Sequence, residues 1–115
     1  MKVWLMGTNA VTADFLALVA NRLPLAGIIG LTEREASDAL SGLVPMREQA
    51  DRYGIPFVGI ESYALTQSED QAALEALDID LLLVMGWQRL VPSWLIEHCR
   101  VGIVGSHGSP QGISG

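Results

Sequence analysis

Leu81-Leu82-Leu83-Val84-Met85 (residues 81–85, LLLVM) decides the fold, because every position in it is apolar. Such a run predicts a strand that is buried on both faces, as in the middle of a parallel sheet. Pro92 follows it and is expected to open a short helix that runs to about His98. A further buried strand is predicted at 101–105 (VGIVG). A strand, a helix and a strand in this order indicate two parallel strands joined by a right-handed crossover.

The chain before this segment repeats the same alternation. Short apolar runs bounded by turn residues predict strands at 2–6, 25–31 and 55–59. Helical spacing predicts one helix that ends before Pro24, a second that is opened by Pro45 and capped by Gly54, and a third that begins with a capping box at 68–71. One face of the first helix is expected to comprise Val11, Phe15, Leu18, Val19 and Arg22. Strands that alternate with helices in this way predict an α/β fold with a doubly wound, mainly parallel sheet.

The composition limits the classes of protein that this chain can represent. Its 115 residues are 50% apolar and 17% charged, which predicts one small domain with a packed core and argues against a disordered chain. No apolar run is long enough to span a bilayer, and the first residues lack the apolar core of a signal peptide, so we expect a cytoplasmic protein without a membrane partner. Seven basic residues against 13 acidic ones argue against nucleic acid as a partner. The single cysteine, Cys99, excludes an internal disulfide and a multi-cysteine zinc site, and we expect it to be a small buried residue.

Three segments are expected at the carboxyl ends of the strands, where open α/β sheets bind their ligands. The first is Gly7-Thr8-Asn9, which has one glycine where a dinucleotide-binding fingerprint has three. The helix that follows it could bind a phosphate or carboxylate at its N-terminus. The simpler interpretation is that Thr8 or Asn9 only caps this helix.

The second and third segments offer a binding loop and a candidate catalytic residue. Gly86 would let a ligand approach the backbone, Trp87 would offer a flat apolar surface, and the backbone after it could bind the edge of a planar heterocycle. In the alternative interpretation Trp87 packs in the core and Arg89 is a solvated residue. His107 follows the last strand closely and lies among glycines, which makes it a candidate for catalysis. His98 is expected near the end of a helix, where it would suit the helix dipole.

Taken in order, these segments resemble the folate-dependent formyltransferases, a family that includes the methionyl-tRNA, glycinamide ribonucleotide and sugar-nucleotide formyltransferases. The resemblance covers nearly the whole chain and rests on four stretches: MKVWLMGTN (1–9), the segment from Val44-Pro45 to Phe57, LDIDLLLVMGWQRLVPSWLI (77–96) and VGIVGSHGSP (101–110). It implies a Rossmann-like formyltransferase fold, of which residues 1–115 would be the N-terminal part.

The resemblance also implies a reaction and a set of site residues. The reaction would be formyl transfer from 10-formyltetrahydrofolate to a primary amine of a small substrate, for example a phosphorylated amine or a sugar nucleotide. His107 would stabilise the tetrahedral oxyanion and assist proton transfer. The folate pocket would be lined by Gly86, Trp87, Gln88, Arg89, Leu90 and Val91, largely through the backbone. Gly7, Thr8 and Asn9 would lie on the side of the amine substrate, and no metal would take part.

Two departures from the family pattern bear on activity. Gly105 stands where the family has an asparagine, two residues before the histidine, and glycine has no side chain with which to donate a hydrogen bond. No carboxylate follows His107, although the family has a catalytic aspartate downstream of this motif. We therefore expect that the 115-residue chain is an incomplete catalytic domain, that it is not competent by itself, and that it exposes apolar surface which favours self-association.

Two alternatives from other classes remain. One is a nucleotide- or NAD-binding α/β module in which Glu33 would bind the ribose, although the lone Gly7 disfavours it. The other is a non-catalytic interaction domain related to the folate enzymes, in which Gly105 marks lost chemistry.

Overall fold

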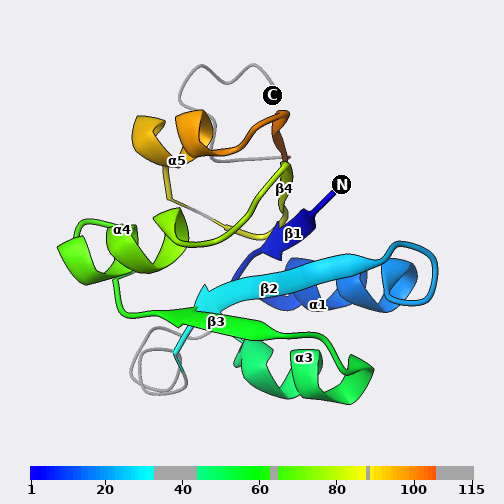
Figure 1. The fold of residues 1–115 in the computed structure, drawn as a ribbon. Helices are drawn as coiled ribbons and strands as arrows, with labels where there is room; N and C mark the ends of the chain where they lie inside the picture. Colours follow the sequence, from blue (N-terminus) through cyan, green and yellow to red (C-terminus); the bar gives the residue numbers. More distant parts are fainter. Residues whose placement is uncertain (33–43, 63–64, 88, 106–115) are drawn as a thin grey trace.

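A parallel sheet with the strand order β3-β2-β1-β4-β5 forms the centre of the molecule (Figure 1). The computed structural model describes residues 1–32, 44–62, 65–87 and 89–105. Every pair of neighbouring strands is parallel. The strands are β1 (Val3–Met6), β2 (Leu25–Leu31), β3 (Phe57–Ile60), β4 (Leu81–Val84) and β5 (Gly102–Gly105). The doubly wound α/β architecture predicted from the sequence is confirmed.

Two layers of helices cover the two faces of this sheet (Figure 1). On one face, α1 (Ala10–Val19) and α3 (Met46–Tyr53) pack on a cluster whose buried members are Leu5, Leu16, Ile28, Met46 and Ala50. On the other face, α4 (Ser68–Glu75) and α5 (Ser93–His98) pack on a larger cluster around Trp4, Ile29, Leu82 and Trp87. Side chains alternate across each strand, so neighbouring residues of β1 enter different clusters.

Several local predictions are confirmed. The strand predicted at 25–31 is β2 (Leu25–Leu31), and Pro92 directly precedes α5. Gly54 ends α3 in the left-handed conformation, with φ of 68°, and its backbone N–H donates to the carbonyl of Ala50. The strand ends differ from the prediction by one or two residues, which is usual because strand ends depend on the neighbouring strands.

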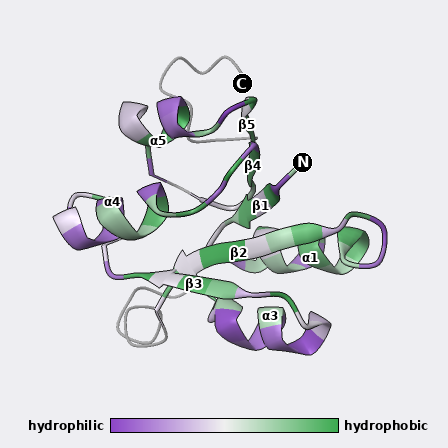
Figure 2. Ribbon diagram, viewed as in Figure 1, coloured by the Kyte–Doolittle hydropathy of each residue, from purple (hydrophilic) through white to green (hydrophobic). Residues whose placement is uncertain are grey.

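The face predicted for α1 is only partly the one that packs on the sheet, because Phe15 packs on the cluster around Leu5 and Leu16 but Val11 and Leu18 do not. Thr12 and Leu16 are its buried residues, whereas Val11 is 52% exposed and Leu18 is 64% exposed. The helix is apolar on more than one side, as Figure 2 also shows, so periodicity alone did not select the face that packs on the sheet. The polar Thr12 turns inward because its hydroxyl bonds to the end of β4.

The capping box predicted at 68–71 is also wrong. Gln67 is the N-cap of α4 and makes no side-chain cap bond, and Ser68 is already helical. Asp70 instead uses both carboxylate oxygens outside the helix, where they accept the N–H groups of Glu61 and Ser62 at 2.9 and 2.8 Å. This buried carboxylate therefore ties the end of β3 to α4, a long-range role that a local motif cannot indicate.

Candidate functional site

The strand order reverses between β1 and β4, which places two of the predicted loops side by side. The chain leaves β1 at Gly7 and turns towards β2, whereas it leaves β4 at Met85 and turns towards β5. This reversal is where open α/β sheets form a ligand crevice. The end of β5 is adjacent, because Gly105 is in register with Val84.

The described residues therefore bring together the segment 7–9, residues 86–87 and 89–91, and the strand that precedes His107 in the sequence. His107 itself, Gln88 and Glu33 lie outside the described residues.

Hydrogen bonds from two threonines join the two loops. The backbone N–H and the hydroxyl of Thr8 both donate to the carbonyl of Gly86, each over 3.1 Å. The hydroxyl of Thr12 donates to the carbonyl of Met85 over 2.6 Å. Both threonines are buried. The space between the two loops, next to the strand ends, is thus filled by the protein's own side chains, and a ligand would have to lie further out, on the loops.

Asn9 caps α1, as the simpler interpretation of the first loop proposed. Its side-chain oxygen accepts the N–H of Val11 over 2.9 Å, and its own N–H donates to the Thr12 hydroxyl over 3.3 Å. These reciprocal bonds form a capping box. Val44 closes over the same turn, since its N–H donates to the carbonyl of Thr8 over 2.7 Å. The N–H of Val11 is thus already hydrogen-bonded within the chain.

The glycines of both loops are needed because Thr12 occupies the space beside them. A Cβ added to Gly7 would overlap the Thr12 hydroxyl and the Met85 carbonyl. Gly86 has a φ of 80°, and a Cβ there would overlap the side-chain oxygens of Asn9 and Thr12. The space beside Gly86, expected to admit a ligand, is therefore taken by α1.

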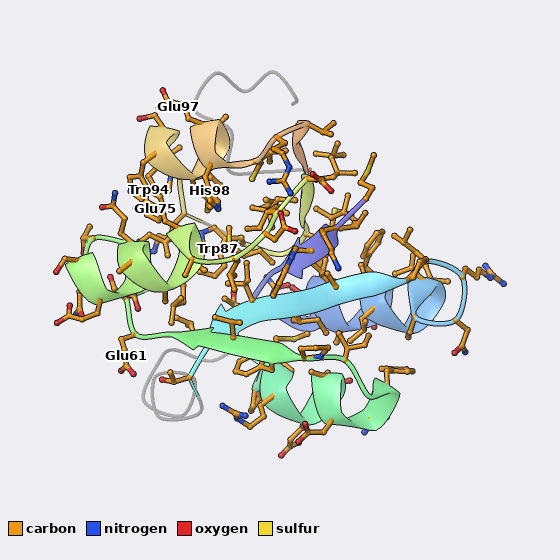
Figure 3. All side chains as sticks on the ribbon, viewed as in Figure 1. Glu61, Glu75, Trp87, Trp94, Glu97 and His98 are labelled. Carbon is orange, nitrogen blue, oxygen red and sulfur yellow. The ribbon has the colours of Figure 1, made fainter. Side chains whose placement is uncertain are left out.

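The loop after β4 is anchored at both ends and exposed in the middle. Trp87 is fully buried among the side chains between the sheet and the helices α4 and α5, as Figure 3 shows. It supports the loop from within and does not present the exposed apolar surface that we expected. Val91 is also buried, whereas Arg89 is exposed and Leu90 is 65% exposed. The outward part of this loop is thus Arg89 and Leu90.

Gly105 leaves no room for a side chain next to β4. A Cβ at this position would lie 2.5 Å from the carbonyl oxygen of Val84 and 3.0 Å from its Cβ. An asparagine, which the family has at the aligned position, would require β4 and β5 to move apart. The glycine that departs from the family pattern therefore fits the close approach of β4 and β5 at this position.

Cys99 and His98 make hydrogen bonds within the fold. Burial raises the pKa of the Cys99 thiol to about 11, which makes it a poor nucleophile, and the thiol donates to the carbonyl of Leu95. Nε2 of His98 lies 2.8 Å from the carbonyl of Leu77 and so joins α5 to the end of α4 (Figure 3).

Among the described residues, no group of three or more His, Cys, Asp or Glu side chains is placed to hold a metal ion. Nor does any described helix have the length and apolar character needed to cross a membrane.

Sequence reasoning missed Thr12, which organises this edge of the sheet. Its signal was present as Asn9-x-x-Thr12, a polar cap residue followed three positions later by a side chain that can reach back. The contact with β4 gives no local signal, because Met85 is 73 residues away.

The fold and the site define the class of an α/β domain that would hold its ligands at the carboxyl edge of a parallel sheet. Over 111 residues the chain is 28% identical to methionyl-tRNA formyltransferase of Acidobacterium capsulatum and 27% identical to methionyl-tRNA formyltransferase of Ectopseudomonas mendocina. Each match covers 95% of this chain but only 35% of the relative, so the chain spans about a third of the length of these proteins. No family model matches the chain. The similarities support a relation to the formyltransferase family without indicating a particular member.

Proposed function

We propose that this chain is the folate-binding, N-terminal part of a formyltransferase domain that transfers a formyl group from 10-formyltetrahydrofolate to a primary amine. The observation that carries the proposal is the similarity to two formyltransferases over 95% of the chain, which includes the loop after β4 and the end of β5. The convergence of these segments at one edge of the sheet supports it.

The loop after β4 is suited to a flat, partly apolar heterocycle. Leu90 offers an exposed apolar side chain between two buried residues, Trp87 and Val91. These two residues anchor the loop in the core, so Leu90 can remain exposed. In this proposal the backbone from Arg89 to Val91 binds the edge of the pterin and Leu90 packs on its face. The formyl group carried by the folate supplies the one-carbon unit.

His107 is the proposed catalytic residue. An imidazole N–H that donates to the developing oxyanion stabilises it most strongly where water is excluded. The segment 7–9 is proposed to face the amine substrate, which we expect to be a small molecule because the chain carries a net charge of −6.

Calorimetry with 5-formyltetrahydrofolate, a stable analogue of the donor, tests the folate site. We expect one molecule to bind per chain, and Leu90→Ser to weaken binding about tenfold through the loss of apolar contact. Leu18→Ser is the matched control, since Leu18 is as exposed as Leu90 but lies on α1. The absence of any binding, or equal weakening by both substitutions, would contradict the proposed site.

A folate-binding module without transfer activity is the second candidate, and the crowding at Gly105 favours it, because the side chain of an asparagine has no space there. A chimera that adds the unmatched remainder of the Acidobacterium capsulatum relative separates the two candidates. Formyl transfer to an amine that is lost in His107→Ala supports the enzyme. Folate binding without any transfer supports the module.

A further inference from the structure

We infer that Thr12 is a positioning residue that holds the two proposed substrate loops together and thereby sets the affinity for folate. The inference rests on the proposed function of the loop 86–91. Thr12 lies on α1, outside both loops. Its hydroxyl is hydrogen-bonded to the chain on both sides, to Asn9 in the first loop and to Met85 at the start of the second.

The hydroxyl of Thr12 is used in both directions. Its single hydrogen is donated to the carbonyl of Met85 over 2.6 Å, and its oxygen accepts the N–H of Asn9 over 3.3 Å. Thr12 is fully buried. Removal of the hydroxyl would therefore leave the part-buried Met85 carbonyl and Asn9 N–H without this partner, which is more costly than the loss of a fully exposed bond.

The backbone on both sides is shaped around this hydroxyl. Gly7 and Gly86 belong to different loops, yet an added Cβ on either would overlap the same oxygen atom of Thr12. Thr8 fixes the carbonyl of Gly86 from the side of β1, and Thr12 fixes the preceding carbonyl, that of Met85. Two successive peptide groups are thus held where the chain adopts a φ of 80° and turns towards Trp87.

The consequence is that the direction of the loop depends on α1. If the carbonyl of Met85 loses its hydrogen bond to Thr12, the turn at Gly86 is held only by Thr8. The position of the exposed Leu90 is then no longer fixed. The loop must then be ordered when a ligand binds, which weakens binding without removing a direct contact.

Three variants test this. Thr12→Val removes the hydroxyl at nearly constant volume, Thr12→Ser retains it, and Ile79→Val shortens a buried side chain that precedes β4, at its opposite end. Calorimetry with 5-formyltetrahydrofolate should give a dissociation constant about tenfold higher for Thr12→Val, in line with the loss of one part-buried hydrogen bond. Thr12→Ser should remain within about twofold of the wild type, and Ile79→Val should bind as the wild type does although it is less stable. Thr12→Ala provides the same comparison if Thr12→Val does not fold.

Hydrogen exchange at the amide of Thr8, which donates to Gly86, gives a readout without ligand. We expect faster exchange in Thr12→Val than in Ile79→Val. Equal folate affinity in these two variants would overturn the inference and leave the proposed function intact. A wild-type chain that binds no folate would overturn the proposed function and the effect of Thr12 on affinity. The exchange rates of Thr8 would still decide whether Thr12 holds the loops together. Equal rates in Thr12→Val and Ile79→Val would show that it does not.

Discussion

Replacement of Gly86 by alanine is the most direct test of the arrangement at the end of β4. The substitution has two separable effects. The first is conformational, because alanine must adopt a φ of 80°, which costs about 1–2 kcal/mol for a residue with a Cβ. The second is steric, because the new methyl group would overlap the side-chain oxygens of Asn9 and Thr12.

The steric effect should be the larger one. If the two oxygens move away, α1 loses its cap, which is worth about 1 kcal/mol, and the part-buried carbonyl of Met85 loses its bond to Thr12, which costs about 1–3 kcal/mol. We therefore expect Gly86→Ala to lower the free energy of unfolding by about 3–6 kcal/mol. Gly54→Ala is the control, since Gly54 has a φ of 68° but no atom within 4 Å of an added Cβ, so only the conformational cost of about 1–2 kcal/mol applies.

Urea unfolding followed by circular dichroism measures both variants, provided that the slope of the transition is unchanged. In a second step, Thr12→Ala in the Gly86→Ala background should cost less than Thr12→Ala alone, because the bond from Thr12 to Met85 is already lost in that background and Thr12→Ala removes the overlap with the new methyl group. Equal losses of stability in Gly86→Ala and Gly54→Ala would refute the reasoning. It would mean that α1 and the loop after β4 are not held in close contact.

Three further outcomes are expected. Asp70→Asn should lower the free energy of unfolding by about 2 kcal/mol in the same urea experiment, because an amide cannot accept both backbone N–H groups, whereas Asp14→Asn on the exposed side of α1 should change it little. Because the raised pKa of Cys99 disfavours the folded thiolate, stability should fall between pH 9 and pH 11 by about 2 kcal/mol more in the wild type than in Cys99→Ala; parallel pH profiles would contradict this. Gly105→Asn should lower the melting temperature, since the side chain would press on Val84, and a variant as stable as the wild type would show that the strands can separate.

Much of the fold was predictable from local features. The runs 25–31 and 81–85 contain no polar side chain, and their shortness and the turn residues around them favour a buried parallel strand. Gly54 and Pro92 mark helix boundaries through backbone constraints that act within one or two residues. The location of the loops at the carboxyl ends of the strands followed from the alternation of the elements alone.

The sequence by itself thus determined the order of strands and helices along the chain, and which loops meet at one edge of the sheet. Only the tertiary structure decided what fills that edge. Trp87 is a core residue because the face of the sheet behind it is covered by α4 and α5, and Thr12 is buried because the end of β4 offers it a carbonyl acceptor. Both outcomes depend on partners distant in sequence. A helix with two apolar sides, such as α1, buries the side whose polar groups also find hydrogen-bond partners, here the side of Thr12 and Leu16.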